Sequence, residues 1–214
     1  YSAANERCKI MQFNLQLGRC YFELKQYDKA MHYYRLAYQD TAMHTFVIPD
    51  IVRLLLAEGK VAEARTFLLR NFEEMPQELP IMEELLNLLS PEKNHDEMKQ
   101  LCNIAISASE DPAEFFNFLT HYCCDNEYYE FGIEICEENL FLEDIAEVIG
   151  YNLAALYLLN GQIPQGCEFL KNAILLCDAN LFLSFTSMSE KIADIPQVVD
   201  IISRYHTSSD SNSN

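Results

Sequence analysis

The sequence contains few of the residues on which several common protein functions depend. Its 214 residues include no Trp, only 6 Gly, and 15 Lys and Arg against 33 Asp and Glu, which gives a net charge of −18. So few glycines leave little room for phosphate-binding loops or many tight β-turns. The shortage of bases argues against binding to nucleic acids or anionic membranes, because both need clustered Lys and Arg. No apolar run approaches the roughly 18 to 20 residues that span a bilayer.

The eight cysteines form no CxxC pair and no regular disulfide framework. Most stand inside apolar helical patterns, where a reduced thiol packs as a small hydrophobic side chain. This usage favours a cytoplasmic location, with the nucleus as the alternative. The chain starts at Tyr1 without a Met or a signal-peptide pattern, so we expect a piece of a longer protein.

No catalytic motif is recognisable. The GxSxG, P-loop, HExxH and glycine-rich dinucleotide patterns are missing from the sequence. His121 and Cys124 share a helix face at i and i+3, but a closed zinc site needs about four ligands, and no second pair has ligand spacing. We therefore expect no enzyme, no catalytic residues, no metal and no cofactor.

The hydrophobic residues, half of the total, recur with a period of 34 residues. Each period divides into two amphipathic stretches of about 12 to 15 residues. Turn residues such as Gly59-Lys60 and Asn160-Gly161 separate the two stretches. The pattern predicts an all-α protein of five antiparallel helix pairs. Three of the columns that carry the period are Leu17, Ile51, Leu85, Leu119 and Leu153, then Tyr21, Leu55, Leu89, Cys123 and Tyr157, then Ala30, Ala64, Met98, Gly132 and Gly166.

The first period resembles the tetratricopeptide repeat. The resemblance covers about residues 11 to 178, and its signature positions are Leu17, Gly18, Tyr21, Ala30, Tyr34 and Ala37. It implies a right-handed superhelical solenoid of antiparallel helix pairs, with a concave groove that holds a peptide or a partner helix. We expect a lead-in at residues 1–10, five repeats at 11–180, a capping helix pair at 181–206 and a polar, flexible tail at 207–214.

The first helix of each pair has a second face, distinct from the face that packs within the stack. This second face recurs from pair to pair. In the first pair this face carries Gln12, Leu15, Arg19 and Phe22. Along the chain it forms a series of hydrogen-bond donors that suits a peptide backbone and a carboxylate. The expected partner-binding residues are Arg19, Arg53, Asn87, His121, Asn117, Phe22 and Tyr151. An equally weighted alternative is that Arg19 and Arg53 only neutralise nearby acids, namely Glu23, Asp50 and Glu83.

A second candidate surface is acidic. Residues 127–144 contain seven acids and no base, and Glu130, Glu134 and Glu138 share one helix face at i, i+4 and i+8. Such a stripe is usually a solvated outer face; the alternative is a docking stripe for a basic segment of a partner.

These features predict a protein–protein interaction scaffold that holds a peptide or a partner subunit within a multiprotein complex. The alternative is a structural or self-associating subunit that uses its end repeats or the acidic face and binds no peptide in the groove. Neither nucleic acid nor a membrane is expected as a partner.

Overall fold

The structure is a computed structural model that describes residues 2–90, 94–175 and 190–211. Within these ranges every regular element is a helix, which confirms the all-α prediction. The helices form two compact units, Tyr1–Ser109 and Glu110–Asn214. None of the described helices is both long and apolar enough to cross a membrane.

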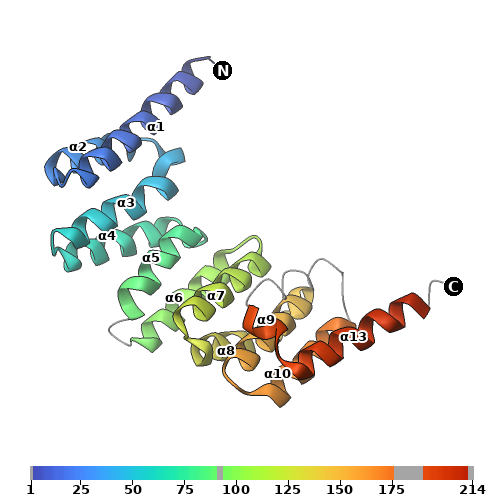
Figure 1. Ribbon diagram of the computed structural model, residues 1–214. Coiled ribbons are helices and arrows are strands. Elements are labelled where there is room, and N and C mark those ends of the chain that lie inside the picture. Colours follow the sequence, from blue (N-terminus) through green and yellow to red (C-terminus); the bar gives the residue numbers. More distant parts are fainter. Residues whose placement is uncertain (1, 91–93, 176–189, 212–214) are drawn as a thin grey trace. The chain divides into compact units, whose positions relative to one another are not determined.

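The first unit contains three helix pairs and a short 3₁₀ helix (Figure 1). Consecutive helices pack against each other, and α3 also contacts α1 and α5. The elements are α1 (Ser2–Glu23), α2 (Tyr27–Ala37), η1 (Thr41–Met43), α3 (His44–Ala57), α4 (Val61–Glu74), α5 (Leu79–Leu89) and α6 (His95–Ala108).

The second unit contains two further pairs and the C-terminal helices. In this unit α9 contacts α7, α8, α10 and α12, and α13 packs on α10. The elements are α7 (Pro112–Asn126), α8 (Tyr129–Glu138), η3 (Glu143–Ile145), α9 (Ala146–Leu159), α10 (Ile163–Leu175), α12 (Glu190–Ala193) and α13 (Pro196–Ser211).

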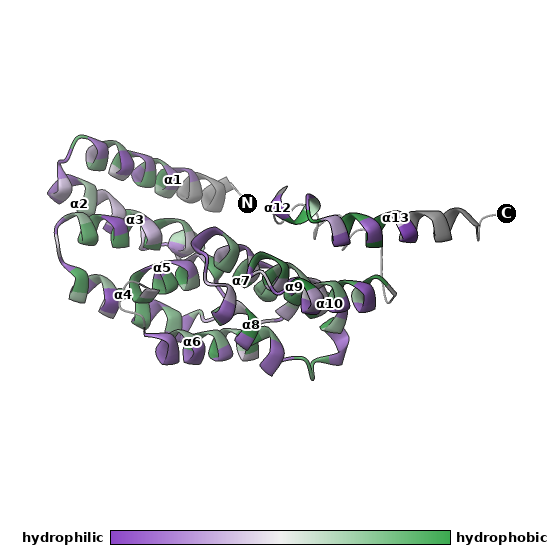
Figure 2. Cartoon of the chain, turned by 60° about the horizontal axis from the view of Figure 1, so that its bottom comes forward, coloured by the Kyte–Doolittle hydropathy of each residue, from purple (hydrophilic) through white to green (hydrophobic). Residues whose placement is uncertain are grey.

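The helix boundaries confirm the 34-residue period. The second helices of the five pairs begin at intervals of 34 residues, at Tyr27, Val61, His95, Tyr129 and Ile163. Hydrophilic and hydrophobic residues alternate along the helices (Figure 2), as expected of amphipathic helices that each bury one side. The right-handed sense of a solenoid stays a prediction.

The turns inside the first, second, fourth and fifth pairs share one backbone geometry. Their left-handed residues are Lys25, Gly59, Glu127 and Gly161, with φ of 56°, 75°, 59° and 79°. The N–H of the next residue donates to a carbonyl five residues before it, as from Lys60 to Leu55 at 2.8 Å. This is the 6→1 bond of a Schellman motif, which ends the helix and turns the chain back. The sequence signal was therefore clear only where glycine occupies the position.

Two boundaries differ from the expected domain limits. The lead-in at residues 1–10 is helical from Ser2 onward, because α1 begins there. The polar tail expected at 207–214 is helical as far as Ser211, where α13 ends. A helix that is already formed extends with less cost than one that must nucleate, so polar residues can continue it. Of the expected cap at 181–206, residues 181–189 lie outside the described part of the chain.

The turn geometry predicts opposite effects for two substitutions. Lys25→Gly should stabilise the chain by up to about 1 kcal/mol, because glycine adopts positive φ without a steric penalty. Gly59→Ala should destabilise it by a similar amount, although no atom lies within 4 Å of the added Cβ. Urea unfolding followed by circular dichroism measures both. Equal stabilities of the three proteins would contradict this account of the turn.

Candidate partner-binding site

Asp50 lies between the two arginines that the sequence singled out. The Asp50 residue is only 3% exposed, and its Oδ2 accepts a hydrogen bond from Arg19 Nε at 2.6 Å. Arg53 Nη1 is 3.7 Å from Oδ1, which is close enough for attraction but too long for a hydrogen bond. The arginines therefore do compensate a buried acid, as the alternative interpretation of Arg19 and Arg53 stated.

The arginines nevertheless remain accessible to a partner. The side chains of Arg19 and Arg53 are 45% and 61% exposed. Arg19 donates to Asp50 through Nε, so this hydrogen bond does not involve its two terminal nitrogens. A guanidinium has five N–H donors, and one buried carboxylate does not occupy all of those on two arginines.

A second acid, one period after Asp50, lies near Arg53. Glu84 of α5 stands 31 residues after Arg53, as Asp50 stands 31 residues after Arg19. Burial raises the pKa of Glu84, Glu83 raises it further, and Arg53 lowers it. A row of charged side chains, hereafter the charge row, is thus formed by Arg19 of α1, Asp50 and Arg53 of α3, and Glu84 of α5. Glu83 was among the acids expected near the arginines, whereas Glu84 was not, although the 34-residue period relates Glu84 to Asp50.

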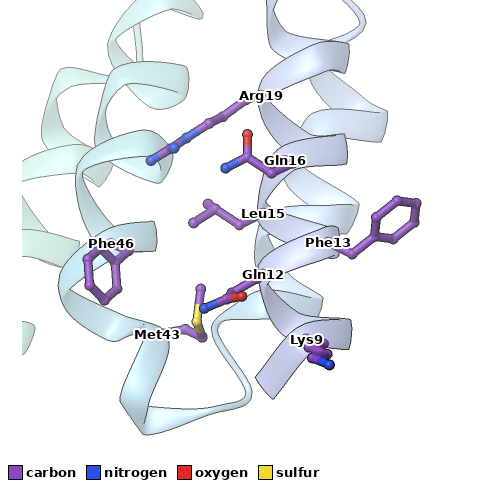
Figure 3. A pocket seen from close by; sticks show the side chains of 8 residues that line it. All are labelled: Lys9, Gln12, Phe13, Leu15, Gln16, Arg19, Met43 and Phe46. Atoms are coloured by element: carbon purple, nitrogen blue, oxygen red, sulfur yellow. The ribbon is translucent and has the colours of Figure 1, made fainter. Parts of the chain in front are cut away.

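A pocket of about 490 Å³ lies beside this row, between α1 and the start of α3. Leu15, Gln12, Gln16 and Arg19 extend from α1 toward the side on which Met43 of η1 and Phe46 of α3 lie (Figure 3). Leu15 and Met43 are each 4% exposed and form the apolar floor, whereas Phe46 is 59% exposed. Lys9 and Phe13 complete the rim. The pocket therefore combines an apolar floor with two amides and two cations.

No sequence signal pointed to Met43, because it lies in η1, before α3 begins. Phe46 was missed although it stands in α3 one period after Gln12, so the column of Gln12 could have found it. Asp40 caps η1 by accepting a hydrogen bond from the Ala42 N–H at 3.1 Å. The ring of His44 then stacks on Tyr38, with centroids 4.2 Å apart. These contacts fix the entry into α3 and so place Met43 and Phe46 opposite α1.

The other predicted groove residues lie in different environments. Phe22 is half-buried against Tyr27, with ring centroids 5.7 Å apart. Asn87 is exposed on α5, in the same unit as Arg19 and Arg53. Asn117, half-buried, and His121, exposed, both belong to α7 of the second unit. The structure brings Arg19 and Arg53 together at Asp50, and the roles of these residues in binding stay predictions.

Tyr151 is a correction to the predicted groove. It is 2% exposed and belongs to the core of the second unit. Ile192 of α12 and Val198 of α13 lie in the same cluster, so the C-terminal helices help to bury this part of α9. The same position of the repeat can therefore be exposed on one first helix and buried on another.

The acidic stripe lies on the solvent side of α8. Glu130, Glu134 and Glu138 are all exposed, whereas Phe131 and Ile135 on the same helix are buried. The neighbouring Glu137 instead accepts a hydrogen bond from the Tyr157 hydroxyl. A role of the stripe in docking stays a prediction.

Most of the described cysteines lie in or near the core. Cys102, Cys123, Cys136 and Cys167 are buried, and burial raises the pKa of Cys136 to about 12. Burial likewise raises the pKa of Cys124, beside His121, to about 12, so its thiol stays protonated at neutral pH. In the described residues no group of three or more His, Cys, Asp or Glu is placed to hold a metal ion.

Comparisons with known proteins concern the fold alone. No family model matches the sequence, and no curated protein matches it either. Among solved structures the chain is similar to a tetratricopeptide repeat protein from Parabacteroides merdae, at 10% identity and a TM-score of 0.43, over 93% of this chain and 80% of that one. It is also similar to the thermophilic tetratricopeptide repeat protein TTC0263 from Thermus thermophilus, at 18% identity and a TM-score of 0.40, over 83% and 98%.

Yeast Tom70 is a further similar structure, at 15% identity and a TM-score of 0.46, over 89% of this chain and 42% of that one. The chain's own geometry agrees with the resemblance found in its first period. Five helix pairs whose second helices start every 34 residues constitute the tetratricopeptide type of fold.

The charge row makes a prediction about Tyr34, whose ring lies against Gly18 and is 1% exposed. Burial raises the Tyr34 pKa from 10.0 to about 12, and Asp50 raises it further, whereas Arg19 and Arg53 lower it. Asp50→Asn should therefore lower the Tyr34 pKa while the chain stays folded. Ultraviolet absorbance titration measures this when the curve of the matching Tyr34→Phe protein is subtracted.

The sign of the pH effect on stability follows from the same shift. The folded chain favours the neutral phenol, so this contribution to stability is present below pH 10.0 and is lost as the pH rises through about 12. Tyr157, whose pKa burial and Glu137 raise to about 12, is the control that Asp50→Asn should leave unchanged. An unaltered Tyr34 titration in Asp50→Asn would contradict the proposed influence of Asp50.

Proposed function

We propose that this chain is a non-catalytic interaction scaffold that holds a segment of a partner protein on its first helices, within a larger assembly. The observation that carries the proposal is the pocket between α1 and α3, where an apolar floor meets the side chains of Gln12, Gln16 and Arg19. The fold supports a binding role in general terms, because stacked helix pairs present extended surfaces. The particular site rests on the pocket.

The pocket fits an extended segment with a large apolar side chain beside an acidic one. Leu15, Met43 and Phe46 would contact the apolar side chain. Gln12 and Gln16 each have an amide that can donate to and accept from a peptide backbone. Lys9 and Arg19 supply positive charge for the carboxylate.

The distribution of charge along the chain favours the same ligand. Residues 1–37 contain six bases and three acids, so their net charge is 6 − 3 = +3, and the remaining residues carry −18 − 3 = −21. An acidic segment is therefore attracted to the first helix pair and repelled by the rest of the chain. The six bases are Arg7, Lys9, Arg19, Lys25, Lys29 and Arg35.

A direct test uses synthetic peptides with one central Phe or Leu flanked by Asp and Glu, and the same peptides flanked by Lys. We expect the intact chain to bind the acidic series, as measured by fluorescence anisotropy. Gln12→Ala combined with Phe46→Ala should weaken binding at least about tenfold, because backbone hydrogen bonds and apolar contact are both lost. Arg19→Glu with Arg53→Glu should abolish it.

Phe141→Ala is the matched control, because Phe141 is also an exposed phenylalanine, at 73% against 59% for Phe46, but lies in the second unit. It should leave the affinity unchanged. Circular dichroism checks that each variant keeps its helices. Equal binding of the acidic and basic series, or undiminished binding by the Gln12 and Phe46 variant, would refute the proposed site.

A further inference from the structure

An exposed apolar stripe runs along α1, beside the pocket. It consists of Ile10, Phe13, Leu17 and Cys20 of α1 and of Leu24, which directly follows the helix, hereafter the α1 stripe. Spacings of 3, 4, 3 and 4 keep these residues on one side. Ile10 is 54% exposed, and Phe13 and Leu24 are each 64% exposed. Cys20 is exposed and Leu17 is partly so. Figure 3 shows the Phe13 ring pointing away from α3.

The same register is buried in the other first helices of each unit. One period later on α3, Val47, Ile51 and Leu54 are 0%, 5% and 0% exposed. On α5, Ile81 and Leu85 are both 0% exposed. On α9, Ile149, Leu153 and Leu156 are all 0% exposed.

The second helix of the preceding pair packs on the next first helix, as α2 does on α3, α4 on α5 and α8 on α9. On the helices that have such a contact, the register of the α1 stripe is buried. Contiguous exposed apolar residues of this kind mark an interaction surface.

We propose that the α1 stripe is covered by the α1 stripe of a second copy of this chain, in antiparallel orientation, which makes a twofold homodimer. Apolar residues at alternating spacings of three and four form the seam along which two helices pack. A twofold contact must be self-complementary, because each residue i that meets j also requires j to meet i.

The side chains that flank the α1 stripe satisfy this condition. Lys9, Gln16 and Glu23 lie along one edge of it, seven residues apart, and all three are exposed. In an antiparallel pair Lys9 of each copy lies opposite Glu23 of the other, and Gln16 lies opposite Gln16. Two opposite-charge pairs are therefore formed, whereas a parallel pair would place like residues at the same level. This complementarity favours a second copy over an unrelated helix.

The size of the α1 stripe sets the expected affinity. One seam of five residues on a single helix is near the lower limit of stable interfaces, so the dimer should dissociate on dilution. Sedimentation velocity and light scattering of the whole chain, in reducing buffer from micromolar to millimolar concentration, should show a monomer–dimer equilibrium. A monomer throughout this range would overturn the proposal.

The first variant places charge in the seam without touching the pocket. Ile10→Glu combined with Cys20→Glu should raise the dissociation constant on the order of 100-fold, because carboxylates would be buried against apolar side chains. Phe141→Glu with Val199→Glu is the matched control, since these residues are 73% and 50% exposed in the second unit. It should leave the dimer unchanged. Equal effects of the two double variants would overturn the assignment to α1.

A charge exchange tests the antiparallel arrangement itself. Lys9→Glu and Glu23→Lys should each weaken the dimer about fivefold, because two favourable pairs become repulsive. The double exchange should restore wild-type affinity. Rescue within one helix is excluded, because 14 residues separate the two positions by roughly 21 Å. Weakening by both single variants without rescue by the double exchange would overturn the antiparallel pairing.

Binding of the acidic peptides separates this inference from the proposed function. Ile10 and Cys20 do not line the pocket, so their double variant should still bind peptide as a monomer. Loss of peptide binding in the pocket variants with an intact dimer would leave the homodimer standing, and the reverse result would leave only the scaffold.

Discussion

Every helix pair in this chain depends on its neighbours to keep its apolar side chains away from water. A single pair buries one side of each helix, and the next pair must cover the other. Val47, Ile51 and Leu54 illustrate this dependence, because they are buried on α3, which α2 contacts. The same register on α1 is exposed. The burial of apolar side chains between neighbouring pairs thus stabilises the stack, and its absence on α1 determines where an interaction surface lies.

The 34-residue period predicted the helix pairs because it reflects this dependence directly. Burial selects apolar residues at fixed positions, and five copies of such a pattern are visible without coordinates. The period did not reveal the turn geometry equally well. Lys25 and Glu127 adopt the left-handed conformation of Gly59 and Gly161, so the backbone is retained where the favoured residue is not. The helical end of α13 was also missed, because a helix can extend through polar residues once its beginning is packed.

The candidate site was predictable where it follows the repeat and hidden where it does not. Arg19 and Arg53 were found because they occupy one column, and the structure places Asp50 beside both. Met43 comes before α3, in a segment shaped by η1 and by the stacking of His44 on Tyr38. Phe46 does follow the repeat, one period after Gln12, but was not recognised as part of the site. Tyr151 fits the column but not the surface, because it belongs to a core cluster that also contains Ile192 and Val198, far along the chain. Column position therefore predicts which way a side chain points, but its exposure depends on what the rest of the chain places over it.

Charge, like the burial of apolar side chains, differs from one part of the chain to another. Against a net charge of −18, residues 1–37 carry +3, and the acidic residues of α8 face solvent in the other unit. Repulsion between like-charged surfaces opposes association of two such chains, so any contact between copies is favoured where bases and acids nearly balance, as do the three bases and two acids of α1. That region is α1, where Lys9 and Glu23 flank the exposed apolar residues. Electrostatics and the hydrophobic effect thus select the same helix, and a partner peptide and a second copy would bind to adjoining faces of it.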